Sequence, residues 1–104
     1  MINKYINGNI VISEFMGYAA DYFYHKIPNW NLLMTVLERI GSIGRTSYQI
    51  TKNGCVIVPI IYDVLSDTMK VHPRISCNGD TTLEAVWAAV VMFIKWHIKN
   101  RGRV

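Results

Sequence analysis

The segment from Ser47 to Val58 reads SYQITKNGCVIV and has the composition of two short strands joined by a tight turn. The turn is expected at Asn53 and Gly54, because both residues accept the positive φ angles of a type I′ turn between β-favouring runs. We therefore predict a β-hairpin. Its second arm, which begins at Cys55, is apolar on both faces, and this favours a central strand that is covered on both sides.

A third strand is predicted on the C-terminal side of the hairpin. Pro59 cannot donate to a β-ladder, so it marks a bend or the end of pairing, and residues 60–65 continue the strand beyond it. A polar turn is expected at residues 66–68. Apolar and polar side chains alternate over residues 69–77, which predicts a half-exposed strand, and Pro73 places it at a sheet edge or a bulge.

Helices are predicted on both sides of these strands in the sequence. Asn29 is a favourable N-cap, and apolar residues recur at helical spacing over residues 30–40. A weaker helical pattern covers residues 2–18. Thr81 and Glu84 form a capping box that opens the longest helix. The main apolar face of this last helix is expected to consist of Leu83, Val86, Trp87, Val90, Ile94 and Ile98.

The predicted order is helix, helix, three strands and helix, in one domain that spans residues 1–104. A chain of 104 residues and 11.9 kDa has no surplus for a second core, and its 51% hydrophobic residues suffice for one. The helices and the strand that is apolar on both faces all need cover. We therefore predict an α+β fold in which a small antiparallel β-sheet is sandwiched between α-helices, in the order α-α-β-β-β-α.

The charge of the chain is mildly basic, with 11 Lys and Arg residues against 7 Asp and Glu residues and a formal net charge of +4. Lys95, Lys99, Arg101 and Arg103 fall within the last ten residues, where cations complement the dipole at the end of a helix. The basic residues form neither a long face nor a pattern interleaved with aromatic rings. We therefore expect no nucleic-acid partner.

No membrane span and no secretory signal are expected. The longest apolar stretch, residues 85–94, is ten residues long, whereas a membrane helix needs about twenty. The first residues lack the arrangement of a signal peptide. Cys55 and Cys77 stand outside any CxxC motif and are predicted to be buried free thiols. These features predict a cytoplasmic protein, in a reducing compartment.

The residues that catalysis or metal binding would need are not grouped in the sequence. His25, His72 and His97 lack the HxH or HxxxH spacing of metal ligands, so no metal and no other cofactor are expected. Asp63 and Asp67 could form a carboxylate pair, but Asp67 lies in a polar tripeptide and is better explained as a turn residue. We therefore predict that the protein is not an enzyme.

The last helix carries a candidate interaction surface. Met92, Trp96 and His97 lie away from its main apolar face, and exposed Trp and Met side chains are typical of protein–protein contacts. Small residues on the same helix would let a second helix approach closely, including one from another subunit. These small residues are Ala85, Ala88 and Ala89.

An aromatic loop is a second candidate for binding. Tyr18, Tyr22 and Tyr24 offer stacking surfaces, and Arg45 or Arg74 offers a positive charge for a small ligand such as a nucleotide. Aromatic residues in such a loop are more often a lid over the core, which is the alternative interpretation.

Three segments carry a resemblance to a known family. They are NIVISEFMGY (residues 9–18), WNLLMTVLERI (residues 30–40) and LEAVWAAVVMFIKW (residues 83–96). In this order, and with a hairpin between the second and the third, they resemble the phage ABA-sandwich domain family over most of the chain. The resemblance implies helices that flank an antiparallel sheet and a phage or prophage source. It supplies no catalytic or binding residues.

Two hypotheses of function follow. The first is a small non-enzymatic phage accessory protein that acts by protein–protein interaction, as a homo-oligomer that then engages a host protein. Inhibition of a host defence system fits this profile. The second is a small-ligand binding protein, with nucleotides as the example. A monomeric mass that does not depend on concentration would count against the first hypothesis, and a melting temperature that nucleotides do not raise would count against the second.

Overall fold

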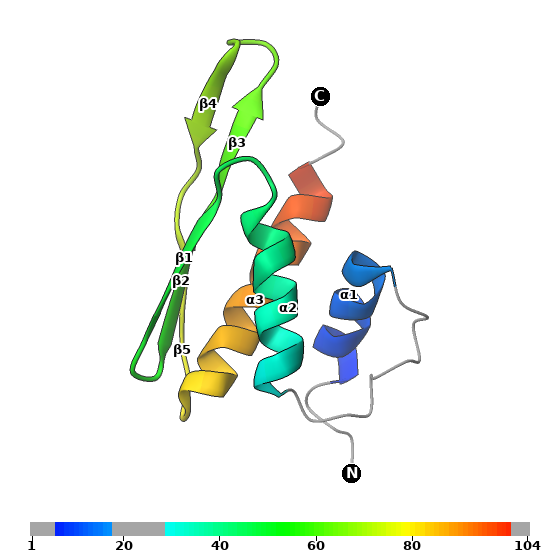
Figure 1. Cartoon of the computed structure of the whole chain (residues 1–104), viewed down its shortest axis with the longest axis vertical. Helices are drawn as coiled ribbons and strands as arrows, with labels where there is room; N and C mark the ends of the chain where they lie inside the picture. The colour runs from blue at the N-terminus through cyan, green and yellow to red at the C-terminus, as the bar shows by residue number, and fades with distance from the viewer. Residues whose placement is uncertain (1–5, 18–28, 101–104) are drawn as a thin grey trace.

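The computed structural model describes residues 6–17 and 29–100 of the chain, which form an α+β fold (Figure 1). The helices are α1 (Ile6–Met16), α2 (Trp30–Gly41) and α3 (Thr82–Asn100). The strands are β1 (Ser47–Thr51), β2 (Gly54–Val58), β3 (Ile60–Asp63), β4 (Thr68–Val71) and β5 (Ile75–Asn78). Within these residues, no helix combines the length and the apolar character that crossing a bilayer requires.

The strands form two antiparallel sheets. The larger sheet has the order β1-β2-β5, so that β2 is its central strand, as predicted. Ile50, Cys55 and Cys77 lie opposite one another across the three strands and therefore on one face. The smaller sheet is a two-stranded ribbon of β3 and β4.

Two prolines divide the larger sheet from the ribbon. Pro59 separates β2 from β3, so the strand does continue beyond the bend, as expected. Pro73 lies between β4 and β5, and the single strand predicted over residues 69–77 is therefore two strands. The physical reason is that proline lacks the N–H that a β-ladder needs. Pro59 ends the ladder between β2 and β3, and Pro73 ends it between β4 and β5, at nearly the same distance from the ribbon tip.

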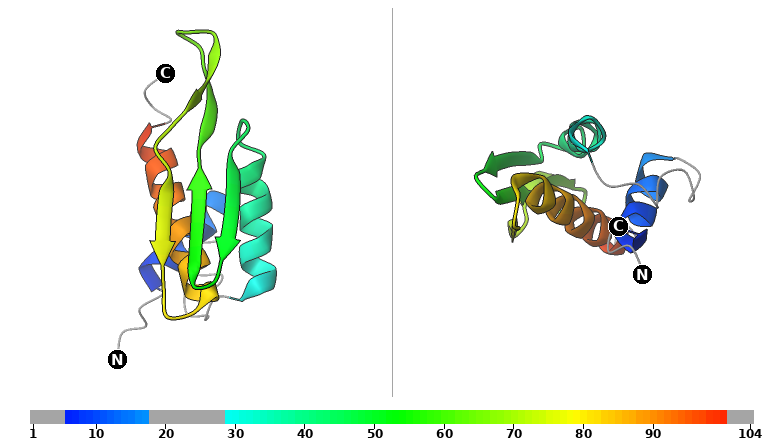
Figure 2. Two further views of the ribbon diagram at one scale, coloured as in Figure 1. Left: turned by 90° about the vertical axis from the view of Figure 1, so that its left-hand side faces the viewer. Right: turned by 90° about the horizontal axis from the view of Figure 1, so that it is seen from below.

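All three described helices lie on the same side of the larger sheet. In Figures 1 and 2, α2 and α3 cover one face of the sheet, and α1 packs behind them on the side away from the sheet. The described residues therefore do not show the predicted sandwich, in which helices cover both faces. Their layers are instead a sheet, a pair of helices and a single helix.

The composition of the outer sheet face explains this difference. On β2, Cys55 and Ile57 point toward the helices and are fully buried, whereas Val56 and Val58 point outward and are half-buried. In the register, Val56 lies between Gln49 and Ser76, and Val58 lies opposite Ser47. Because the two neighbouring strands supply polar side chains, this face needs no helix over it. Helices on both faces were predicted from the apolar residues of β2 alone, without the polar residues that its neighbouring strands contribute.

The helix signals in the sequence are confirmed. The side chain of Asn29 accepts a hydrogen bond from the Leu32 N–H (2.9 Å) at the start of α2. The Thr81 hydroxyl accepts one from the Glu84 N–H (3.1 Å) at the start of α3. The α1 helix ends at Met16, and Gly17 follows with φ +78°, a conformation that glycine adopts at little cost.

The turn of the first hairpin is displaced by one residue from its predicted position. Thr51 pairs with Gly54, so the two loop residues are Lys52 and Asn53. Asn53 has φ 56°, but Gly54 is the first residue of β2. A Cβ at Gly54 would lie 2.7 Å from the Thr51 hydroxyl and 3.2 Å from Asn78 Oδ1. A glycine is therefore needed at position 54 because neighbouring strands pack closely there, and not because the turn requires its conformation.

The packing of α1 on α3 depends on a small residue and a buried hydrogen bond. A Cβ at Gly8 would overlap the ring of Trp87, so the absence of a side chain lets the helices approach closely. Beside it, Trp87 Nε1–H donates to the buried Asn9 Oδ1 (3.0 Å). Ala85 and Ala89, expected to receive a further helix, are fully buried within the chain itself. The predicted apolar face of α3 was therefore too narrow, and it also included Ile98, which is 41% exposed.

The core lies between the larger sheet and the helices. It contains aliphatic side chains of α2, inward side chains of β2 and one side of α3, with Ile12 from α1. Its largest fully buried members are Phe93, Ile12, Leu33, Leu37, Ile40, Ile57 and Ile94.

Candidate functional site

The β3–β4 ribbon projects from the body of the molecule, beyond the end of the larger sheet (Figure 2). Its register defines two faces. Ile60 lies opposite Val71, and Tyr62 lies opposite Met69 on the same face, so that this face is apolar. The other face carries Ile61 opposite Lys70, followed toward the tip by Asp63 opposite Thr68.

The turn at the tip is held by the side chains of two aspartates. Asp63 accepts hydrogen bonds from the Leu65 N–H (3.1 Å) and from the Ser66 hydroxyl (3.0 Å). Asp67 has φ 55° and accepts a hydrogen bond from the Tyr62 hydroxyl. That hydrogen bond raises the pKa of Tyr62 above its ordinary value. The structure thus confirms Asp67 as a turn residue, and Asp63 shares this structural role.

Large apolar side chains surround this tip and are exposed to solvent. Leu65 is 92% exposed, Val64 65% and Tyr62 49%, and Val71 is exposed on the adjoining strand. Single exposed apolar residues are ordinary, but a group of them on a projecting element is typical of a contact surface. This group was not among the surfaces predicted from the sequence. The signal that could have found it is the apolar pair Val64-Leu65 directly before the predicted polar turn, in residues that were expected to continue the strand but lie beyond the end of β3.

A groove of about 530 Å³ lies between the ribbon and the C-terminal end of α3. The ribbon and its turn contribute Ile61, Tyr62, Asp63, Val64, Leu65 and Lys70, the following link contributes His72, and α3 contributes Trp96, His97 and Asn100. At the base of the groove, the rings of His72 and Trp96 meet edge to face with centroids 4.9 Å apart. The Trp96 ring also packs on Phe93 (5.8 Å), and this contact with the core fixes its position.

The structure separates the three residues of the predicted interaction surface. Trp96 and His97 line the groove, whereas Met92 lies outside its lining. The Cys77 thiol contacts the Met92 sulfur (3.1 Å), so Met92 borders β5 although it is 50% exposed. His97 is half-buried, and its ring stacks on Phe93 with centroids 5.9 Å apart.

A second hollow, of about 640 Å³, lies among the three helices. Its lining includes Glu14, Phe15, Arg39 and Ser42, together with His97 from α3. The Arg39 guanidinium carbon lies 5.3 Å from the centroid of the Phe15 ring, a cation–π contact that joins α2 to α1. The Arg39 guanidinium therefore has a role in helix packing.

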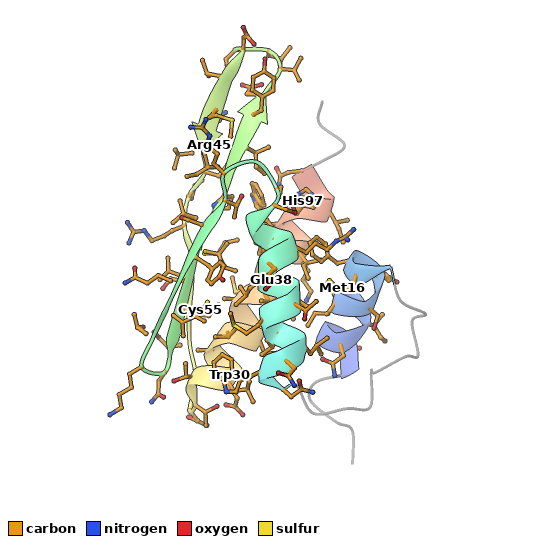
Figure 3. The ribbon with its side chains drawn as sticks, in the orientation of Figure 1. Met16, Trp30, Glu38, Arg45, Cys55 and His97 are labelled. Atoms are coloured by element: carbon orange, nitrogen blue, oxygen red, sulfur yellow. The ribbon has the colours of Figure 1, made fainter. Side chains whose placement is uncertain are left out.

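The predicted ligand loop is only partly within the described residues. Tyr18, Tyr22 and Tyr24 lie outside them. Arg45 is exposed between α2 and β1, close to the base of the ribbon (Figure 3). Its backbone N–H donates to the Ile60 carbonyl (2.7 Å), which ties this connection to the start of β3.

The two cysteines are free and face each other across neighbouring strands. Cys55 is buried between the sheet and the helices (Figure 3), whereas Cys77 is half-buried, less than predicted. Burial, together with the neighbouring Cys77, raises the pKa of Cys55 to about 11. Burial also raises the pKa of Cys77. Neither thiol therefore has the lowered pKa of a nucleophilic cysteine.

Metal-ligating side chains are dispersed. Over residues 6–17 and 29–100, no three His, Cys, Asp or Glu side chains are close enough to hold a metal ion.

No protein-family model, no curated protein and no solved structure matches the chain. The resemblance to the phage ABA-sandwich domain family therefore stays a prediction from the sequence.

Proposed function

We propose that this protein is a non-enzymatic binding protein that acts through protein–protein contact, with the β3–β4 ribbon as its contact surface. The observation that carries the proposal is the group of exposed apolar side chains on the ribbon, led by Leu65 at 92% exposure. A two-stranded ribbon is marginally stable by itself in water. A surface that leaves apolar side chains on such an element is best explained by a partner that covers them.

The biological setting is part of the same proposal. We infer a phage or prophage accessory protein that forms a homo-oligomer and engages a host protein in the cytoplasm, with inhibition of a host defence system as its role. The sequence resemblance supports the origin.

Substitution of Leu65 tests the contact surface. In Leu65→Lys the charge lies at the centre of the exposed group, and stability should change by no more than about 0.5 kcal/mol because Leu65 is exposed. Met34→Lys is the matched control, since Met34 is also an exposed apolar residue but lies on α2. Tagged versions of the three proteins would be compared by affinity capture from host extract.

The informative result is a difference between the variants. A protein retained by the unsubstituted chain and by Met34→Lys, but lost from Leu65→Lys, supports the ribbon as the contact surface. Proteins captured equally by all three contradict the proposal.

A second candidate function is binding of a nucleotide in the groove. The edge-to-face rings of His72 and Trp96, with Lys70 in the same lining, offer an aromatic surface beside a positive charge. If a nucleotide binds there, ATP or GTP should raise the melting temperature of the unsubstituted chain and not that of Lys70→Ala. Melting temperatures that nucleotides leave unchanged would exclude this candidate.

A further inference from the structure

We propose that the groove between the ribbon and α3 receives the ribbon of a second copy of this chain, in a reciprocal two-fold arrangement. This inference rests on the proposed protein-binding function and names the partner. In such a dimer the two ribbons run in opposite directions, so that the tip of each reaches the base of the other. Each copy then contributes the same surface, in which its ribbon fills the partner's groove and its groove holds the partner's ribbon, as a two-fold interface requires.

The two ends of the groove are complementary in polarity, since an apolar tip would meet an aromatic base. The tip presents the exposed side chains of Val64 and Leu65. The base presents the rings of His72 and Trp96, whose centroids are 4.9 Å apart. Apolar residues at the tip of one copy would cover the aromatic rings at the base of the other, and a single symmetry operation makes both contacts at once.

The charges along the groove-facing side of the ribbon are also self-complementary. Lys70, opposite Ile61, is the cation nearer the base, and Asp63, opposite Thr68, is the carboxylate nearer the tip. When two such faces lie antiparallel, the Asp63 of each copy lies over the Lys70 of the other. Opposite charges therefore meet at two equivalent places.

The same charge pattern argues for a second copy over other partners. Over residues 60–71 the ribbon carries the carboxylates of Asp63 and Asp67 and the cation of Lys70, so it has no positive excess that would select a polyanion or an acidic peptide. The ribbon also has a structural need for cover, because two strands alone are marginally stable. A second ribbon covers the groove-facing side and the tip with a surface that the chain already possesses.

A mixed cysteine experiment tests the antiparallel arrangement. Leu65→Cys places a thiol at the tip, and Asn100→Cys places one at the base, where Asn100 lines the groove. The two single variants are mixed in equal amounts and oxidised, and the products are resolved on a non-reducing gel and by mass spectrometry. We expect a disulfide-linked dimer that joins residue 65 of one chain to residue 100 of the other.

Each single variant oxidised alone is a control for linkage between two identical positions. The unsubstituted chain is a control for linkage through the native thiols of Cys55 and Cys77. Leu65→Cys alone should give at most one tenth of the linked dimer of the mixture, because the two tips lie at opposite ends of the paired ribbons. Efficient linkage between two Leu65→Cys chains, or no linkage in the mixture, would overturn the arrangement.

A charge substitution gives an independent measurement. Lys70→Glu places two carboxylates together at each of the two contacts, whereas Lys52→Glu makes the same change in the β1–β2 turn at the far end of the sheet. Light scattering should give twice 11.9 kDa for the unsubstituted chain and for Lys52→Glu. The dissociation constant of Lys70→Glu should rise at least tenfold.

Failure of this inference can be told apart from failure of the proposed function. If the unsubstituted chain is a monomer at every concentration, a second copy is not the occupant of the groove. The homo-oligomer would then be excluded as well, but protein–protein contact through the ribbon still stands if Leu65→Lys loses a captured protein that Met34→Lys retains. If the chain is a dimer that Lys70→Glu leaves intact, the two copies meet elsewhere and the inference is wrong.

Discussion

At the scale of single residues, burial determines the chemistry of the Cys55 thiol. Cys55 is 1% exposed and lies opposite Cys77 on the neighbouring strand β5. Its pKa shift comes from burial and from Cys77, and neither of these stabilises the thiolate. Its pKa therefore rises from 9.0 to about 11, because the thiolate would lose its hydration without gaining a compensating charge. The thiol behaves as a small apolar core group rather than as a nucleophile.

The raised pKa of Cys55 predicts a loss of stability in alkaline solution. The unfolded chain releases this proton near pH 9, whereas the folded chain retains it to about pH 11. The stabilising contribution is therefore complete below pH 9 and is lost as the pH rises to 11, with a size of about 2–3 kcal/mol. Urea unfolding of the unsubstituted chain and of Cys55→Ala between pH 8 and pH 11 measures it. Parallel curves for the two proteins would contradict the prediction.

Gly8 is the second residue whose environment gives a clear prediction. Alanine usually stabilises a helix by about 1 kcal/mol relative to glycine, but a Cβ at position 8 would overlap the Trp87 ring. We expect Gly8→Ala to destabilise the protein by about 1–3 kcal/mol through overpacking. Gly41→Ala is the control, because a Cβ there lies 4.0 Å from the Thr46 carbonyl oxygen, its nearest neighbour. Equal melting temperatures for the two variants would show that α1 does not pack on α3 in this way.

At the scale of elements, local side-chain chemistry determines where the helices begin. Asn29 and Thr81 precede α2 and α3, and each accepts a hydrogen bond from a backbone N–H in the first turn. Both signals involve residues three positions apart, so they are visible in the sequence. The first residues of these two helices were therefore predicted more accurately than the faces that the helices bury.

The N-cap of α2 can be tested directly. Asn29→Ala removes the acceptor for the Leu32 N–H, and we expect the free energy of unfolding to fall by about 1 kcal/mol. Asn31→Ala, two residues into the same helix, is the control and should leave stability unchanged or slightly increased, because alanine is the better helix former. Chemical denaturation of both variants provides the comparison. An Asn29→Ala variant as stable as Asn31→Ala would argue against the cap.

The ribbon is an element whose strands follow from the sequence but whose position does not. Pro59 predicts a bend after β2, and alternation predicts a strand over residues 69–77 with Pro73 at an edge or a bulge. They do not say that β3 and β4 pair with each other beyond the end of the larger sheet, since pairing depends on contacts between residues far apart in the chain. The exposure of Leu65 and Val64 follows from that position alone.

At the scale of the whole molecule, the layers predict where hydrogen exchange will be fast. The β1-β2-β5 sheet is covered by α2 and α3 on one face, whereas the ribbon projects beyond that cover (Figure 1). Amides of residues 60–71 should therefore exchange faster than those of β2 in dilute protein. If a second copy covers the ribbon, raising the protein concentration should slow exchange in residues 60–71 and leave β2 unchanged. Mass spectrometry of peptic peptides measures both, and slowing spread over the whole chain would contradict a local interface.

The amino-acid sequence by itself determined the order of the helices, the caps of α2 and α3 and the bend at Pro59. These features depend on residues within one or two turns of each other, so they are local properties of the chain. The turn was predicted one residue too late because Gly54 is required for close packing against Thr51 and Asn78 on the neighbouring strands, which the local sequence does not show.

The tertiary structure alone decided the one-sided helical cover, the projection of the ribbon and the groove beside Trp96. Each of these depends on which strands pair and on what their neighbours place on a shared face. Among the described residues no helix covers the outer sheet face, where polar residues of β1 and β5 flank β2, although β2 by itself is apolar enough to be covered. The groove likewise joins His72 to Trp96, residues on separate elements that only the long-range packing of ribbon against helix brings together.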